Sequence, residues 1–260
     1  MIQLTFGFGP IEAEFWRWMF VMTRIGAAML AAPFFGAGSV PYQVRVVAAG
    51  SLAAMVCGWT DVAAPPALLS IAGLLWLAGE VLIGLALGFV LQLSFAAPTM
   101  AAEVIGGTMG MSMASSVDPH SGTHSPALGQ YFAVVLTLVF LATGGHLIWL
   151  RLLVDSYTAF PPGQTWLGPD RLAEVAGFAA AMFTAAVAIA LPVTVVLVLV
   201  QLLAGVLSRS APSLNLFSLG LPAGVLAGLA ALIVSAPLVT EQMTQLSMEA
   251  VTHAARIAAR

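Results

Sequence analysis

The sequence has very few charged residues and no lysine at all. Charged residues make up 7% of its 260 residues, whereas an ordinary soluble domain carries about 25%. A chain this poor in charge cannot cover a large core in water, so lipid or apolar partner subunits must surround it. The net charge of −3 and the eight scattered arginines also argue against a basic surface for nucleic acid.

The sequence also lacks the patterns that mark catalytic and redox sites. It has no glycine-rich phosphate loop, no zinc-protease motif, no nucleophile elbow and no pair of closely spaced cysteines. Cys57 is the only cysteine, so no intramolecular disulfide can form, and we expect a small buried hydrophobic residue there. The first charges are Glu12 and Glu14, so a cleaved signal peptide is not expected. We therefore predict a protein that is not an enzyme and that holds no cofactor or metal.

Long hydrophobic runs fill most of the chain, since 60% of its residues are hydrophobic. Gly177 to Ser208 is free of charge for 32 residues and Ser210 to Thr240 for 31, whereas one membrane span needs about 20. Each run is either one steep helix or, as we favour, a helix broken midway, because prolines fall within or beside both: Pro192, Pro212, Pro222 and Pro237. The sequence predicts one all-α, membrane-associated domain over residues 1–260. We expect about six hydrophobic helical segments, broken at proline and glycine and packed among partners.

Small residues recur at the spacing that lets helices approach closely. Gly84 and Gly88 are four apart, as are Gly106 and Gly110, and a triple spacing follows at Gly220, Gly224 and Gly228. Four-residue spacing places glycines on one helix face, where they allow backbone contact.

One acidic residue lies within an apolar run. Glu80 stands in GLLWLAGEVLIGLALGF, at a depth where an ionisable group is costly unless it is paired or hydrated. Arg17 and Arg24 are seven apart, would share a helix face, and offer partners. The residues leave open whether Glu80 fixes helix register or relays protons. A second polar pattern, Thr194, Gln201 and Ser208, faces either another helix or an aqueous passage.

The stretch from residue 107 to 130 reads GTMGMSMASSVDPHSGTHSPALGQ, and it separates two apolar regions. Its methionines alternate with small or polar residues, and a period of two is wrong for a helix face. His120 and His124 would share a face only on a helix, which the neighbouring prolines and glycine disfavour, so no metal site is expected. The segment either lines a protein cavity, where methionine suits a surface that rearranges, or is an ordinary loop outside the membrane.

Several motifs together resemble one family. The run LSRSAPSLNLFSLGLPAGVLAG, residues 207–228, is similar to the signature of the flagellar biosynthetic protein FliR and its injectisome counterparts. The matching positions are Arg209, Pro212, Asn215, Phe217, Gly220, Pro222 and Gly228. TRIGAAMLAAPFFG with Arg24, VPYQVRVV with Arg45, GEVLIGLALGF with Glu80 and the GTMGMSMASSVDP stretch agree with the same family, in order along nearly the whole chain. Ser213 departs from the glutamine that the family often has.

The resemblance implies a non-enzymatic subunit of the type III protein export gate. Its fold would be hairpins of broken helices in a heteromeric helical channel. Its partners would be FliP-like and FliQ-like subunits, FlhB and FlhA, membrane lipid and unfolded exported polypeptides. The location would be the bacterial inner membrane at the flagellar basal body.

The resemblance also assigns roles to residues. A loop at about residues 108–125 would plug the channel, with the candidate residues Met109, Gly110, Met111, Ser112, Met113, Asp118 and Pro119. We further expect Arg24, Arg45 and Glu80 to fix helix or subunit register through buried pairing. Two alternatives stay open: an injectisome export subunit, and a secondary transporter for a small solute that couples through Glu80, Glu103 or Asp118.

Overall fold

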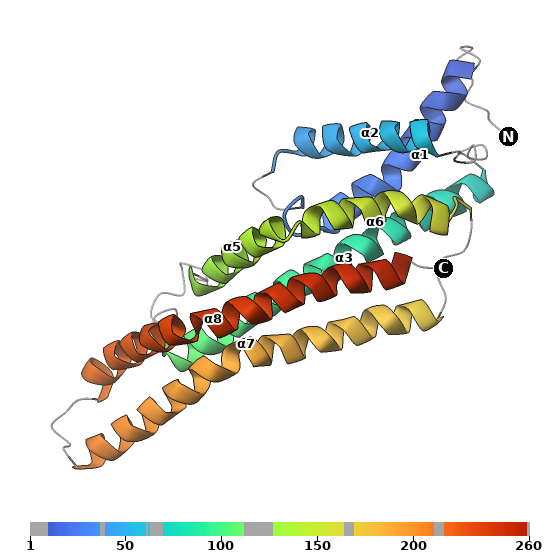
Figure 1. Ribbon diagram of the computed structural model, residues 1–260. Helices are drawn as coiled ribbons and strands as arrows, with labels where there is room; N and C mark the ends of the chain where they lie inside the picture. Colours follow the sequence, from blue (N-terminus) through green and yellow to red (C-terminus); the bar gives the residue numbers. More distant parts are fainter. Residues whose placement is uncertain are drawn as a thin grey trace. The chain divides into compact units, whose positions relative to one another are not determined.

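The computed structural model describes residues 10–36, 40–60, 62, 70–111, 127–163, 169–210 and 216–258. The regular structure in these ranges is α-helical throughout, which confirms the predicted class. Figure 1 shows seven labelled helices in chain order: α1 (Pro10–Ala31), α2 (Tyr42–Trp59), α3 (Ile71–Thr108), α5 (Ala127–Ala142), α6 (Gly145–Ala159), α7 (Pro169–Ser210) and α8 (Leu216–Ala258).

The chain's few polar and proline residues mark several helix ends. Pro10 and Pro169 are the first residues of α1 and α7, a position where the missing N–H group costs nothing. Glu12 lies in the first turn of α1, and Arg209 and Arg256 lie in the last turns of α7 and α8. Each charge has the sign that the helix dipole favours at that end.

Three of the four prolines in the long runs do not end their helices, and Pro212 lies outside the described residues. The helix α7 continues through Pro192, and α8 continues through Pro222 and Pro237, so the predicted break midway is not found at these points. A proline removes one N–H group, whereas ending the helix in an apolar setting would expose a whole turn of backbone. The break that does occur separates α5 from α6 at Gly144, whose φ of 73° is the left-handed conformation that favours glycine.

Three of the described helices are long and apolar enough to cross a membrane: Ile71–Thr108, Ala173–Arg209 and Pro222–Arg256. The number rises to four if α5 and α6 together form one broken span. The described chain is therefore a helical membrane protein, although the predicted count of about six segments is not confirmed.

The chain forms two compact units. Unit 1 holds residues 1–93, 144–179 and 249–260, and unit 2 holds residues 94–143 and 180–248. The helices α3, α7 and α8 each contribute residues to both units, so most of the division falls within helices and not at loops. The single domain over residues 1–260 stays a prediction.

Each unit has its own apolar core. In unit 1, Phe20, Ile25, Leu87 and Trp149 are almost fully buried, and the Trp149 indole N–H donates to the Leu87 carbonyl oxygen at 3.2 Å. Helices α1 and α2 are joined by the Trp18 indole, which donates to the Gly50 carbonyl oxygen at 2.9 Å.

In unit 2, the rings of Phe95 and Phe140 meet edge to face with centroids 5.8 Å apart. Leu136, Val193 and Met243 are completely buried there.

Candidate functional site

The helices α1 and α3 approach closely along a face of small residues. A Cβ atom placed on Gly84 would meet the Arg24 carbonyl oxygen, and one placed on Gly88 would meet the Ala28 carbonyl oxygen. These contacts confirm the predicted use of the Gly84 and Gly88 pair, because any side chain there would press against backbone that cannot turn aside. Glu80 precedes Gly84 by four residues, so it lies on this same face of α3.

Glu80 forms a buried ion pair with Arg24 at the end of that face. The Arg24 side chain is completely buried and the Glu80 side chain is 2% exposed. Arg24 Nε donates to one carboxylate oxygen and Nη2 to the other, both at 2.8 Å. This two-point geometry is the strongest that arginine and a carboxylate form.

The remaining N–H groups of Arg24 reach the end of α6. Nη1 donates to the Ser156 carbonyl oxygen at 2.8 Å and to the Ser156 hydroxyl at 3.1 Å, and Nη2 also donates to the Phe160 carbonyl oxygen at 2.9 Å. Both carbonyl groups lie at the carboxyl end of α6, where the helix dipole favours a cation, and the Ser156 oxygen also accepts from the Phe160 N–H group at 2.9 Å. With Glu80 included, these bonds employ all five donors of the guanidinium group.

Tyr157 completes the surroundings of Arg24. The Arg24 guanidinium carbon lies 4.1 Å from the centre of the Tyr157 ring, within the range of a cation–π interaction. The Tyr157 hydroxyl in turn donates to the Val21 carbonyl oxygen at 2.6 Å, one turn before Arg24 on α1. We call the set Arg24, Glu80, Ser156, Tyr157 and Phe160 the arginine cluster, and it ties α1, α3 and α6 together.

The other two arginines considered as partners lie elsewhere. Arg17 donates to the Cys57 carbonyl oxygen at 2.5 Å and lies 3.5 Å from Glu14. Arg45 donates to the Val40 carbonyl oxygen at 3.0 Å, at the start of α2. The structure therefore pairs Glu80 with Arg24, while the register role of Arg24, Arg45 and Glu80 stays a prediction.

The stretch of candidate plug residues begins where α3 ends. The Met109 N–H group still donates to the Ile105 carbonyl oxygen at 2.9 Å, and Gly110 follows with a φ of 83° that turns the chain out of the helix. Met109 is almost fully buried, and Met111 is 37% exposed. Ser112, Met113, Asp118 and Pro119 lie outside the described residues, as do His120 and His124.

Met109 sits against two glycines of α8, one turn apart. A Cβ atom on Gly224 would lie 3.1 Å from the Met109 carbonyl oxygen. A Cβ atom on Gly228 would lie 2.7 Å from Met109 Cγ and 3.0 Å from its sulfur, and still closer to the terminal methyl group. We call this contact the glycine notch: Gly224 and Gly228 give room for Met109 because they lack side chains.

The polar pattern on α7 does not form one continuous path. Thr194 and Ser208 donate to carbonyl oxygens of their own helix, Ala190 and Gly205. Gln201 instead donates from its side-chain amide to the Thr108 carbonyl oxygen at 2.6 Å. The middle member of the pattern therefore caps the end of α3 directly before Met109, and the two outer members only satisfy α7.

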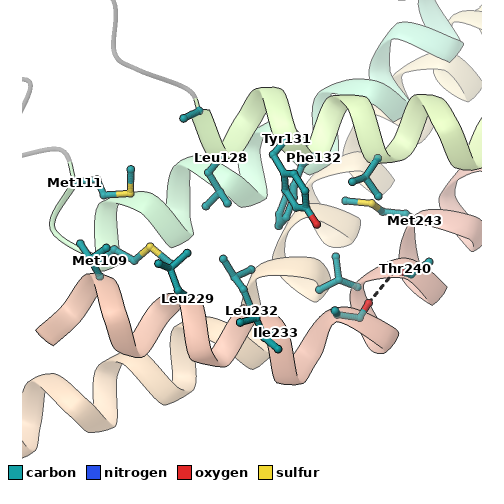
Figure 2. A pocket seen from close by; sticks show the side chains of 15 residues that line it. Met109, Met111, Leu128, Tyr131, Phe132, Leu229, Leu232, Ile233, Thr240 and Met243 are labelled. Carbon is teal, nitrogen blue, oxygen red and sulfur yellow. Dashed lines mark hydrogen bonds between the residues drawn. The ribbon is translucent and has the colours of Figure 1, made fainter. Parts of the chain in front are cut away.

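A cavity of about 630 Å³ adjoins the glycine notch within unit 2. Figure 2 shows its wall, built from the end of α3, the start of α5 and one face of α8, and lined by Met109, Met111, Leu128, Tyr131, Phe132, Leu229, Leu232, Ile233, Thr240 and Met243, among others. The Thr240 hydroxyl donates to the Ala236 carbonyl oxygen at 2.8 Å, so it offers its proton to its own helix and not to the cavity. The lining is therefore almost wholly apolar.

The remaining motif residues lie in or near the α7–α8 connection. Arg209 is exposed at the end of α7, and Pro222 is exposed on α8. Pro212 and Asn215 lie outside the described residues, as does the side chain of Phe217, whereas Gly220 lies in the first turns of α8. Among the described residues of this motif, Gly228 lies against another candidate residue, Met109.

Sequence reasoning missed several partners in these two places. Ser156 and Phe160 act through backbone carbonyl groups, which no side-chain pattern reveals, and Tyr157 is one of three ordinary tyrosines. The described part of the chain contains no group of three or more histidine, cysteine, aspartate or glutamate residues that could hold a metal ion.

Residues 15–250 match the family described as bacterial export proteins, family 1. The chain is 32% identical over 219 residues to the flagellar biosynthetic protein FliR of Escherichia coli K12, covering 84% of this chain and 83% of that protein. It is also 32% identical over 220 residues to FliR of Bacillus subtilis 168, covering 83% and 84% of the two chains. The corresponding protein of Pectobacterium carotovorum is 30% identical over 222 residues, covering 85% and 84%. The chain therefore belongs to this family of bacterial export proteins and is a helical membrane component of flagellar type III export.

Proposed function

We propose that this chain is a non-enzymatic wall subunit of the flagellar export channel and that its segment at about residues 108–125 plugs the channel at rest. Membership of the export family supports the general assignment. The observation that supports a wall subunit in particular is the large apolar surface that the long helices leave uncovered. Only 28% of the most apolar window of α7 is buried within the chain, and only 17% of that of α8.

The large exposed apolar side chains of α7 lie between Phe183 and Leu207, a stretch about 36 Å long at 1.5 Å per residue. Phe183, Val187, Leu191, Leu199 and Leu203 are each more than half exposed. At 1.5 Å per residue, α7 and α8 are each about 63 Å long, roughly twice the thickness of the hydrocarbon core of a bilayer. The exposed apolar stretch is comparable in length to the hydrocarbon core, so lipid can cover part of it, and we propose that neighbouring apolar subunits cover the rest.

The partners that we propose are FliP-like and FliQ-like subunits in a hetero-oligomeric gate, with FlhB and FlhA as further partners. The location that follows is the bacterial inner membrane at the flagellar basal body. Purification of the full chain from its own cells in mild detergent tests this assignment. We expect it to co-purify with FliP-like and FliQ-like chains, and a stable solitary protein or a homo-oligomer would contradict the assignment.

The arginine cluster supports a structural subunit over a proton-coupled transporter. A coupling carboxylate has to exchange protons, whereas both oxygens of Glu80 accept charged hydrogen bonds from Arg24 in a buried site. Glu103 is exposed on α3, and Asp118 lies outside the described residues. The flagellar system is favoured over an injectisome because the relatives reported above are flagellar proteins.

Deletion of residues 110–121 tests the plug. The variant is produced in cells with the rest of the export apparatus, and the passive leak of ions across the inner membrane is measured. We expect the deletion to raise the leak while the subunit still assembles. A normal leak through a normally assembled complex would refute the plug assignment.

A further inference from the structure

We infer that the glycine notch and Gln201 position the start of the plug, and that Met109 leaves the notch when the channel opens. The residues involved are Gln201 on α7, Gly224 and Gly228 on α8, and Thr108 and Met109 at the end of α3. This inference rests on the proposed plug function, which it deepens by naming the residues that hold the plug at rest. We call this arrangement the Met109 latch.

The first part of the latch is a packing contact that only glycine permits. The Met109 side chain occupies the space that a Cβ atom on Gly228 would take. The Met109 backbone lies against Gly224, where an added Cβ would stand 3.1 Å from its carbonyl oxygen. An alanine at position 228 would therefore displace the flexible end of Met109 from its seat, and the helix itself would not have to move.

The second part is a single hydrogen bond. Thr108 is the last residue of α3, and the last carbonyl groups of a helix are those that side-chain donors cap. The Gln201 amide donates to it at 2.6 Å. Position 108 is thus held from α7 and position 109 from α8, so two helices fix the point at which the chain leaves α3.

The surroundings allow the latch to open. A Cβ atom on Gly106 or Gly107 would meet nothing within 4 Å, so the last turn of α3 has open space beside it. Met109 already lines the cavity of about 630 Å³ next to the notch, which is large enough to take its side chain (Figure 2). Met109 therefore has two apolar positions, the notch and the cavity, and its unbranched side chain can change between them at little cost.

The first experiment compares two alanine substitutions in the full chain within its export apparatus. Gly228→Ala fills the notch, whereas Gly205→Ala adds the same methyl group on α7, where nothing lies within 4 Å. We expect Gly228→Ala to raise the ion leak about fivefold, the shift that loss of one modest interaction produces in a two-state equilibrium. Gly205→Ala should leave the leak unchanged.

A double substitution shows whether Met109 is the partner of Gly228. Met109→Ala alone should raise the leak to a similar level, and adding Gly228→Ala should not raise it further, because the contact is already lost. Gln201→Leu should add to the leak of Gly228→Ala, since it removes the separate bond to Thr108. Additive effects of the substitutions at positions 109 and 228 would overturn the latch.

A cross-link tests the geometry and the opening directly. Cys57 is the only native cysteine, so Cys57→Ser gives a background in which Met109→Cys and Gly228→Cys can pair. The Met109 Cγ atom stands where the sulfur of a cysteine at position 109 would be, and a Cβ at position 228 would lie 2.7 Å from it, so the two cysteines are close enough to form a disulfide after a small adjustment. Oxidation, with loss of two thiol protons and two electrons to a mild added oxidant, should form the bond and stop export, and a reductant should restore export.

The outcomes separate the latch from the plug. If the deletion of residues 110–121 raises the ion leak but Gly228→Ala and Met109→Ala do not, the plug assignment is supported and the latch is wrong. If the deletion variant shows no increase in ion leak, the proposed plug function itself is wrong. Where a substitution prevents assembly, the cross-link decides, because absence of the disulfide, or undiminished export with the disulfide formed, overturns the latch in a protein that is folded and inserted.

Discussion

Replacing Glu80 with glutamine should destabilise the protein strongly, although the two side chains have nearly the same shape. Glutamine keeps one acceptor for Arg24 and turns an NH₂ group toward the other donor, so a completely buried guanidinium loses its counter-charge. Breaking one side of a buried ion pair costs about 3–5 kcal/mol, and we expect about 3 kcal/mol because one hydrogen bond is retained. That is a large share of the roughly 5–15 kcal/mol by which a typical protein is stable.

A matched pair of substitutions separates the contribution of the Arg24–Glu80 ion pair from that of the hydrogen bonds between Arg24 and the end of α6. Glu80→Leu alone should cost about 5 kcal/mol, because no acceptor remains for two of the Arg24 donors. Arg24→Met together with Glu80→Leu should recover most of that loss, since both charges are gone and Met can still pack on the Tyr157 ring. Recovery should stop short of the original stability, because the end of α6 loses the cation bound to Ser156 and Phe160.

Thermal unfolding of the full chain in mild detergent measures these effects. In a chain of this size, 3 kcal/mol corresponds to a fall in Tm of about 6–12 °C. Trp149 is buried in the same unit, and a variant in which the other five tryptophans are replaced by phenylalanine lets its fluorescence report the loss of packing. An unchanged Tm for Glu80→Gln would refute the reasoning, and normal stability and assembly combined with lost export would favour proton coupling at Glu80.

The other predictions concern glycines outside the notch. Gly84→Ala should lower stability by about 1–3 kcal/mol, because the new Cβ atom meets the Arg24 carbonyl oxygen; Gly79→Ala, on the same helix with nothing within 4 Å, is the control and should be neutral or slightly stabilising. Both are checked by Tm, and equal effects would contradict the close contact of α1 and α3. Gly144→Ala should lower the free energy of unfolding by about 1–2 kcal/mol, because alanine disfavours a φ of 73°. A lower helix content or folding yield would report this loss. A variant with unchanged helix content and yield would show that the break between α5 and α6 needs no left-handed residue.

The general class of the molecule could be predicted from its composition, and some contacts from residue spacing. The shortage of charge required an apolar environment, and the four-residue spacing of Gly84 and Gly88 predicted their close contact with another helix. The sequence also picked out Glu80 as a residue that needs a partner. It could not choose Arg24 over Arg17, because both lie on one face of α1 and the choice depends on how α1 slides along α3.

The rest depended on interactions that leave little trace in a sequence. The break at Gly144 lies in a charge-free run between two ordinary apolar segments, whereas Pro192, Pro222 and Pro237 lie inside continuous helices. A missing N–H group can be tolerated locally in a long helix, while a left-handed glycine redirects the whole chain. The contact of Met109 with Gly228 spans 119 residues of sequence and depends on where α3 ends against the side of α8.

The arginine cluster also constrains the order in which the protein can be made. Arg24 is synthesised well before Glu80, and its other acceptors, at Ser156 and Phe160, come more than 130 residues after it. A guanidinium group held in oily surroundings without those acceptors is costly, so the nascent amino-terminal helix needs water, lipid headgroups or an insertion factor beside it until residue 160 has emerged. This unit can then fold only after residue 160 has been synthesised. A chain that ends before residue 160 would contain the positive charge of Arg24 without all of its acceptors.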